Sequence, residues 1–345
     1  MAKLFFLLSG EHETLPVAEL KAILEADGCS FKMLEKLDQV LRLEAEMSCI
    51  EAIKHKAAFT RVAGLELFNS EAEVSKIMKN IRSISLNNIL EHEESFAVRV
   101  KHVKNYASKI NGMLLERKLG GIILGEKVKA KVNLKNPNKV FIGVLTGEKF
   151  IFGVKLAEIP PKPFFERRPR KKPFFHPSAM PSKLARCMVN LTKPKTGELV
   201  LDPFCGTGSM LIEAGLIGCR VLGLDIQRRM VRGTLKNLAY FNISPESVIV
   251  ADAGKLPIIK ISCVVTDPPY GRSTTTLKRT TKQIIEEVLA SISGIICREG
   301  RICIAAPKTL NVGQIGTALG YKHLESHFVY VHRTLTREIA VFEKV

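Results

Sequence analysis

Short apolar strands alternate with amphipathic helices in the second half of the chain, and four of these strands run into an aspartate. We predict the strands at ELVLD (198–202), RVLGLD (220–225), SVIVAD (247–252), CVVTD (263–267) and GRICIAAP (300–307). Helical patterns separate most of them, at 209–218, 230–242 and 282–296. This alternation is typical of a doubly wound, mainly parallel α/β sheet. Ligands bind such sheets beyond the carboxyl ends of the strands, where the aspartates are expected.

The segment LDPFCGTGSMLIEAG (201–215) predicts a strand, a glycine-containing turn and a helix. Gly206 and Gly208 allow the backbone to come close to a ligand. The dinucleotide pattern GxGxxG would need a small residue at position 211, where this chain has Leu211. Asp202 would repel a pyrophosphate, but it suits a ligand that carries an ammonium group, such as the methionine part of S-adenosylmethionine.

Asp225 follows Asp202 by one βα unit, where an acid commonly accepts hydrogen bonds from ribose hydroxyls. Asp252 could accept a hydrogen bond from an adenine amino group. Each aspartate alone could simply cap the helix that follows it. Four aspartates at successive strand ends favour a ligand site instead.

The sequence VVTDPPYGRS (264–273) places two prolines at a strand end. Proline fixes its own backbone angle and pushes the preceding residue towards extended geometry, so the carbonyls of Asp267 and Pro268 should point in fixed directions. With the Asp267 carboxylate they could accept both hydrogens of an exocyclic amine. Tyr270 could stack on the ring that carries this amine. The alternative is an ordinary proline-rich tight turn.

The first half of the chain predicts two smaller α+β units. Residues 1 to about 65 indicate a strand at 3–10, a helix at 16–28 and a strand at 39–46. Residues 66–158 indicate helix, strand, helix, strand and strand, with the second helix at 106–121. The strands over 127–159 carry Lys127, Lys129, Lys131, Lys135 and Lys139, which are either a solvated face or an RNA-facing one.

Residues 160–181 hold seven of the sixteen prolines, six Lys or Arg and four phenylalanines. We predict an extended, semi-rigid linker without a helix, pinned to a surface by its aromatic side chains. Its cations could also contact phosphates. The formal net charge of +18 favours a polyanionic partner over a merely lysine-rich surface.

Other sequence features exclude several kinds of protein. The apolar run from Leu4 to Leu8 is too short for a secretory signal, and no segment reaches the roughly 18 apolar residues of a membrane helix, so we expect a cytoplasmic protein. The eight cysteines form no CxxC pair and no zinc-binding pattern, and most lie in apolar runs as small buried hydrophobes. A disulfide between Cys297 and Cys303 remains open. The closing segments 323–334 and 336–345 predict a pair of strands.

These motifs together resemble a known family. DPFCGTGSMLIEA and DPPYGRS are similar to the cofactor-binding and catalytic motifs of S-adenosylmethionine-dependent amino-methyltransferases. FHPSAMPSKLAR resembles the segment that precedes the catalytic core in an RNA-modifying branch, and VNLKNPNKVFIGVLTGEKFIFGVKLAEI resembles the end of a THUMP domain. Over essentially its whole length, the chain resembles the archaeal THUMP-domain tRNA guanine-N2-methyltransferases that act at position 10.

The resemblance implies an N-terminal ferredoxin-like domain (1–65), a THUMP domain (66–158), a Pro/basic linker (159–181) and a Rossmann-like methyltransferase domain (182–345). It implies S-adenosylmethionine as the cofactor, tRNA as the partner, one or two methyl transfers, and a monomer without a metal. The implied catalytic residues are Asp267, Pro268, Pro269 and Tyr270. The implied cofactor-binding residues are Asp202, Pro203, Phe204, Cys205, Gly206, Thr207, Gly208, Asp225, Ile226, Asp252, Ala253 and Asp267. The implied RNA-binding residues are Arg167, Arg168, Arg170, Lys171, Lys172, Lys135 and Arg272, while His176 could contact cofactor or RNA.

Several alternatives remain at this point. A DNA amino-methyltransferase shares the DPPY motif but is not expected to carry the THUMP-like half. A THUMP methyltransferase could act on another guanosine, such as position 6, although Arg272 and Ser273 favour position 10. A non-catalytic RNA-binding protein would use the same basic surface without the aspartates. A THUMP thiolation enzyme would need a nucleotide phosphate loop and a reactive cysteine pair, which the sequence lacks.

Overall fold

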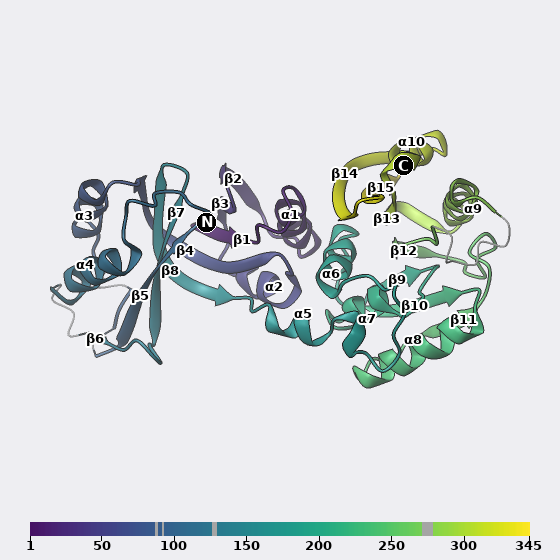
Figure 1. The fold of residues 1–345 in the computed structure, drawn as a ribbon, viewed down its shortest axis with the longest axis horizontal. Helices are drawn as coiled ribbons and strands as arrows, with labels where there is room; N and C mark the ends of the chain where they lie inside the picture. The colour runs from purple at the N-terminus through teal and green to yellow at the C-terminus, as the bar shows by residue number, and fades with distance from the viewer. Residues whose placement is uncertain (87–88, 92, 126–129, 271–278) are drawn as a thin grey trace. The chain divides into compact units, whose positions relative to one another are not determined.

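The computed structural model describes residues 1–86, 89–91, 93–125, 130–270 and 279–345 (Figure 1). The chain divides into two compact units. Unit 1 comprises Met1–Glu11, Cys29–Lys54 and Thr60–Ile159. Unit 2 comprises His12–Gly28, His55–Phe59 and Pro160–Val345. Among the described residues, no helix is both long and apolar enough to cross a membrane.

Unit 1 is built on a mixed sheet of eight strands in the order β2-β3-β1-β4-β8-β7-β5-β6. The strands are β1 (Ala2–Leu8), β2 (Phe31–Leu37), β3 (Val40–Ala45), β4 (Thr60–Glu71), β5 (Ser95–His102), β6 (Lys131–Val132), β7 (Lys139–Thr146) and β8 (Lys149–Glu158). The helices are α2 (Cys49–Lys56), whose last two residues belong to unit 2, α3 (Val74–Arg82) and α4 (Gly112–Gly125). The sequence analysis missed β2, α2 and most of β4.

The predicted domain boundary at residue 65 falls inside β4. This strand pairs with β1 through Thr60–Leu65 and with β8 through Val62–Glu71, antiparallel in both cases. The strands before and after residue 65 therefore form one continuous sheet. The helix predicted over 106–121 begins at Gly112, because Asn111 Oδ1 accepts the Leu114 N–H at 3.0 Å and caps it there.

Unit 2 contains a sheet of seven strands in the order β11-β10-β9-β12-β13-β15-β14. The strands are β9 (Leu199–Asp202), β10 (Arg220–Asp225), β11 (Ser247–Val250), β12 (Ile261–Thr266), β13 (Ile296–Pro307), β14 (Tyr321–His332) and β15 (Leu335–Lys344). The first five in this order are parallel, while β15 is antiparallel to both β13 and β14. The predicted α/β sheet and its closing pair of strands are confirmed.

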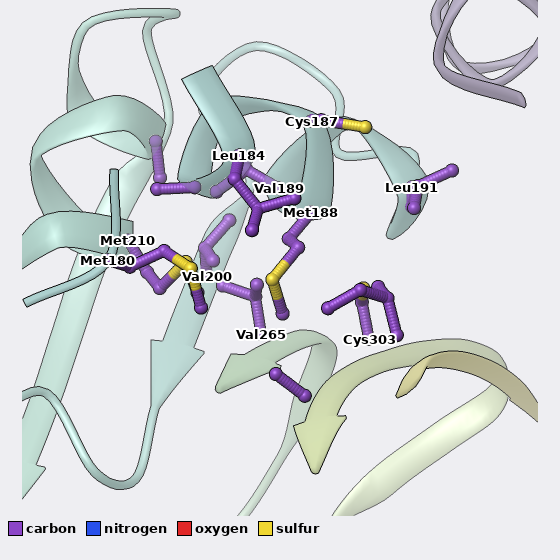
Figure 2. Close-up of a cluster of buried hydrophobic side chains, with 14 of the residues drawn as sticks. Met180, Leu184, Cys187, Met188, Val189, Leu191, Val200, Met210, Val265 and Cys303 are labelled. Atoms are coloured by element: carbon purple, nitrogen blue, oxygen red, sulfur yellow. The ribbon is translucent and has the colours of Figure 1, made fainter. Parts of the chain in front are cut away.

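The helices that the structure describes in unit 2 come next in the architecture. They are α1 (Leu15–Ala26), α5 (Lys162–Glu166), α6 (Ser182–Leu191), α7 (Ser209–Gly215), α8 (Arg228–Tyr240), α9 (Thr281–Ser293) and α10 (Val312–Ala318), with 3-10 turns at Pro169–Lys171 and Lys308–Leu310. Figure 2 shows one core cluster, in which Leu184 and Met188 of α6 meet Val200, Val265 and Cys303 of the sheet. All eight cysteines are free, and six are buried as predicted.

The prediction that residues 160–181 contain no helix is wrong. α5 forms there because its prolines occupy the start of the helix, where no backbone N–H is needed. Phe174 pins the segment to α8: its N–H donates to Asn237 Oδ1 at 2.8 Å and its carbonyl accepts from Asn237 Nδ2 at 2.9 Å. The Phe174 ring also lies against Gly233 of α8 and Phe164 is buried, whereas Phe165 and Phe175 are exposed, so only part of the expected anchoring by aromatic side chains is present. The segment is part of unit 2.

Helix α1 belongs to unit 2 although it lies near the start of the chain. Leu15, Ala18 and Ala22 of this helix join the same apolar cluster as α6. Glu19, which is fully buried, accepts hydrogen bonds from the N–H groups of Ala58 and Phe59 and from Asn190 Nδ2 at 2.7–3.1 Å. Residues of α1, far upstream in the sequence, therefore complete the apolar core around α6.

We expect Glu19→Ala to lower the free energy of unfolding by about 3 kcal/mol, because it leaves buried N–H groups without an acceptor. Chemical denaturation at pH 8 measures this effect above the Glu19 pKa, which burial raises to about 7. Glu25→Ala is the matched control, since Glu25 lies on the same helix in a half-exposed ion pair with Lys193. Equal losses in the two variants would contradict the role given to Glu19.

Candidate active site

One cavity lies at the carboxyl edge of the parallel strands, and all four predicted aspartates line it. Asp202 and Asp225 are the last residues of β9 and β10. β11 ends two residues before Asp252, and β12 ends one residue before Asp267. The strands predicted at 247–252 and 263–267 therefore end one or two residues earlier than expected. The predicted convergence of the four aspartates at one edge of the sheet is confirmed.

The cavity wall contains nearly all the residues predicted to bind cofactor or act in catalysis. They are Asp202, Pro203, Phe204, Cys205, Gly206, Thr207, Asp225, Ile226, Asp252, Ala253, Asp267, Pro268, Pro269 and Tyr270, together with His176. Gly208 is not part of the wall, but it sets the turn. Its φ is +78°, and a Cβ there would stand 2.9 Å from Thr234 Cγ2. Gly206, with φ of +54°, leaves open space where a side chain would otherwise project.

Asp202 is a buried carboxylate at the floor of this cavity. Its Oδ1 accepts hydrogen bonds from Thr266 Oγ1 at 2.8 Å and from the Phe204 N–H at 3.1 Å. Burial raises the pKa of Asp202 to about 7, and the carboxylates of Asp267 and Asp225 add to the shift. Four aspartates and three arginines (Arg229, Arg279 and Arg337) line the wall, and the carboxylates near Asp202 favour a positively charged group of a ligand at that point.

Asp225 faces the cavity and also holds the chain just before α8, although it does not cap that helix. Its Oδ1 accepts the N–H of Gln227, the residue that precedes α8, at 2.8 Å, and its Oδ2 accepts the Gly206 N–H at 3.0 Å. Asp225 thereby ties the glycine turn to the next strand while it faces the cavity. Asp252 accepts the Gly254 N–H at 3.0 Å and pairs with Arg279 at 3.2 Å. These contacts lower the pKa of Asp252, the Gly254 hydrogen bond most.

The DPPY segment meets an arginine from the last strand of the sheet. Arg337 of β15 donates from Nε to the Tyr270 hydroxyl, and its Nη2 lies 3.5 Å from Asp267 Oδ2. Its guanidinium also lies 5.6 Å from the centre of the Tyr270 ring. Among the described residues, Asp267 Oδ1 is buried without a hydrogen-bond partner. Burial raises the pKa of Asp267, while Arg337 and Tyr270 oppose that shift.

Known proteins similar to this chain share its whole length. The tRNA (guanine(10)-N2)-dimethyltransferase of Methanothermobacter thermautotrophicus is 37% identical, over 99% of this chain and 100% of that protein. The protein of the same name from Methanocaldococcus jannaschii is 35% identical over 99% of each chain. The chain belongs to the tRNA (guanine(10)-N2)-methyltransferase family.

Family models and solved structures agree with a methyltransferase fold in this family member. A model described as "RMKL-like, methyltransferase domain" matches residues 169–337, and one described as "DNA methylase" matches residues 71–236. The crystal structure of TrmN from Thermus thermophilus covers 99% of this chain and 100% of that chain, with a TM-score of 0.55 at 17% identity. SMU.472, a putative methyltransferase solved with SAH, has a TM-score of 0.54 at 14% identity, with 100% of this chain and 99% of that chain covered. At these identities the likeness shows the fold alone.

The structure of this tRNA methyltransferase separates the predicted RNA-binding cations into two groups. Arg168, Arg170, Lys171 and Lys135 are exposed. Arg167 instead pairs with the buried Glu213 at 2.8 Å, and Lys172, also buried, donates to Ser209 Oγ at 3.0 Å. Both side chains turn towards these partners inside the protein, so we do not propose them as RNA contacts. Arg272, Lys127 and Lys129 lie outside the described residues.

Sequence reasoning missed Arg337 and Arg279, which both line the cavity of the methyltransferase. A partial signal for Arg337 exists in the closing segment. The closing segment forms a strand antiparallel to β13, in which Arg337 is opposite Pro307. The first residues of this strand therefore lie at the carboxyl edge of the parallel strands. No comparable signal marks Arg279, whose ion pairs with Asp252 and Glu287 depend on the path of the chain after the DPPY segment.

Proposed function

We propose that this enzyme transfers a methyl group from S-adenosylmethionine to the exocyclic N2 of guanosine at position 10 of tRNA. The observation that carries the proposal is the buried Asp267 Oδ1, which has no partner among the described residues and borders the same cavity as Tyr270. A buried acceptor without a donor favours a ligand that brings an N–H group. The names of the full-length relatives support guanine N2 as that group, and their dimethyltransferase activity supports a second transfer.

The residues of the cavity fit the chemical groups of S-adenosylmethionine. The cofactor supplies an electrophilic methyl group on a positively charged sulfonium. Asp202 is placed for the ammonium group, Asp225 for the ribose hydroxyls and Asp252 for the adenine amino group. The open space at Gly206 lets the backbone approach the ligand. The three carboxylates of Asp202, Asp225 and Asp267 suit a cationic ligand better than a pyrophosphate.

Asp267, Pro268 and Tyr270 then hold the target base. The Asp267 carboxylate and the Pro268 carbonyl accept the two N–H bonds of the guanine amino group, so that the nitrogen lone pair faces the methyl group. Tyr270 stacks on the base, which has left its own helix at a cost of a few kcal/mol. The amine nitrogen would bond to the methyl carbon as the carbon–sulfur bond breaks, S-adenosylhomocysteine would leave, and the amine would then lose its proton to solvent. Orientation supplies much of the rate. No strong base is needed in this scheme.

We propose that unit 1 grips the tRNA. The strand order β2-β3-β1-β4 supports the proposed ferredoxin-like domain, and α3, α4 and β5–β8 are the elements of the proposed THUMP domain. The exposed Lys131 and Lys135 of this unit, and Arg168, Arg170 and Lys171 of the linker, supply positive charge for phosphates.

The proposed reaction predicts specific products. Purified enzyme with labelled S-adenosylmethionine and unmodified tRNA should yield N2-methylguanosine and then N2,N2-dimethylguanosine, as measured by mass spectrometry of the digested nucleosides. Methyladenosine or methylcytidine as the product would overturn the assignment to guanine. The absence of any methylated nucleoside, with intact tRNA binding, would favour a non-catalytic RNA-binding protein.

The role of Asp202 predicts a pH dependence of cofactor binding. Since its pKa in the free enzyme is about 7, Asp202 gains a proton below that pH. The ammonium group favours the carboxylate, so cofactor affinity should rise between pH 6 and pH 7.5, and binding near pH 6.5 should release a proton. Calorimetry in two buffers of different ionisation enthalpy measures this release. Asp202→Asn should abolish it, whereas Asp252→Asn should retain it because Asp252 is already ionised.

A further inference from the structure

The hairpin of β14 and β15 exposes an unusual group of side chains. Phe328 is 54% exposed and Tyr330 is 72% exposed. Because they are two residues apart on one strand, both side chains lie on the same face of the hairpin. Large aromatic side chains exposed together on a surface usually mark a binding site. We call Phe328, Tyr330, Lys308 and Arg333 the hairpin strip.

Positive charge accompanies these aromatic rings. The Lys308 ammonium lies 5.0 Å from the centre of the Phe328 ring, and Arg333 is exposed at the turn of the hairpin. The sequence from Phe328 to Leu335 contains no aspartate or glutamate. The hairpin strip therefore offers aromatic faces and cations together, which is the combination that binds unpaired nucleotides.

The register of the sheet places the hairpin strip near the cavity but on the other face of the hairpin: Val329 and Arg337 share one face, so Phe328 and Tyr330 point to the opposite one. Arg337, which lines the cavity, is the partner of Val329 on one side and of Pro307 on the other. Tyr330 pairs with Thr336, one step closer to the turn. Neighbouring strands are roughly 5 Å apart, so the backbone of Tyr330 lies within about 10 Å of that of Arg337. This is a short distance for a polynucleotide whose target base occupies the cavity.

We propose that the hairpin strip binds the tRNA strand next to the target nucleotide. This inference rests on the proposed function, because a target base that leaves its helix exposes the faces of its neighbours. One neighbouring base stacks on Tyr330 and another on Phe328, while Lys308 and Arg333 contact the adjacent phosphates. Two exposed aromatic rings beside Lys308 and Arg333, on a segment (328–335) without aspartate or glutamate, favour RNA over a protein bound along the edge of β14.

Steady-state kinetics of the full chain test this proposal. Tyr330→Ala and Phe328→Ala should each raise the KM for tRNA about tenfold through the loss of one stacked base, with little change in kcat. Tyr330→Phe should behave like the wild type, because it keeps the aromatic face. Lys308→Gln should reduce the slope of log KM against log salt by about one unit. Binding of S-adenosylhomocysteine should be unchanged in every variant.

Tyr240→Ala is the matched control, because Tyr240 is 61% exposed on α8 and is not part of the hairpin strip. Unchanged KM values for tRNA in both the Tyr330 and Phe328 variants would overturn the proposal, as would an equal effect of Tyr240→Ala. That outcome would leave the wild-type reaction intact, and it would point to a protein partner for the hairpin. Failure of the proposed function is distinct, because the wild type itself would then make no N2-methylguanosine.

Discussion

Replacing Asp267 with alanine should reduce methyl transfer by at least about a hundredfold while tRNA binding stays within about threefold of the wild type. The loss is large because the substitution removes the carboxylate that orients the amine, an interaction needed most in the transition state. Single-turnover rates measure the chemical step, and filter binding at fixed salt measures tRNA affinity.

Asp267→Asn separates the negative charge of this side chain from its capacity to accept a hydrogen bond. It keeps one acceptor oxygen without the charge, so its rate should lie between those of the wild type and Asp267→Ala. The melting temperature should be followed in both variants, because removal of the carboxylate leaves Arg337 unpaired in a buried position. Parallel loss of tRNA binding and methyl transfer in a folded Asp267→Ala protein would contradict the assigned role.

Replacing Arg337 with methionine should lower kcat about tenfold to a hundredfold with little change in the KM for either substrate. Arg337 touches the Tyr270 hydroxyl and faces Asp267, so its loss frees two groups that hold the base. Small displacements of groups that orient the substrate lower the rate of the chemical step more than they lower the affinity for the substrate. We regard Arg337 as a positioning residue on this evidence.

The pH profile distinguishes positioning from a merely structural effect. The charged groups around Asp267 are Arg337, which lowers its pKa, and the neighbouring carboxylate of Asp202. Without Arg337 the pKa of Asp267 rises further, so its ionisation moves to higher pH. The residual activity of Arg337→Met should therefore increase more steeply with pH than that of the wild type. Arg337→Lys should restore the wild-type profile with a reduced kcat, since it keeps the charge.

Arg301→Met provides the control for this experiment. Arg301 lies on the adjacent strand β13, pairs with Glu343 at 2.8 Å and is not among the residues that line the cavity. Its loss should leave both kcat and the pH profile unchanged. A wild-type pH profile in Arg337→Met, together with a lower melting temperature, would contradict the positioning role.

The sequence predicts the parts of this enzyme that depend on local pattern. Asp202, Asp225, Asp252 and Asp267 could be placed at one edge because parallel strands bring their carboxyl ends together. The rigidity of the segment at Pro268 follows from proline chemistry alone.

Contacts between distant parts of the chain could not be predicted in this way. Lys172 and Arg167 stand among exposed cations in the sequence, and only the path of the chain turns them towards Ser209 and Glu213. Helix α1 carries an ordinary amphipathic pattern. This pattern does not reveal that Glu19 accepts a hydrogen bond from Asn190 within unit 2. Arg337 acquires its role from antiparallel pairing with β13.

The central claim concerns one atom of one nucleotide, and a single substitution in the substrate tests it most directly. Inosine at position 10 of a tRNA removes the 2-amino group and leaves the rest of the base in place. With labelled S-adenosylmethionine, we predict methyl incorporation into the guanosine-10 tRNA and none into the inosine-10 tRNA, with similar binding of both. Equal incorporation into the two tRNAs would contradict the assignment of guanine N2 at position 10.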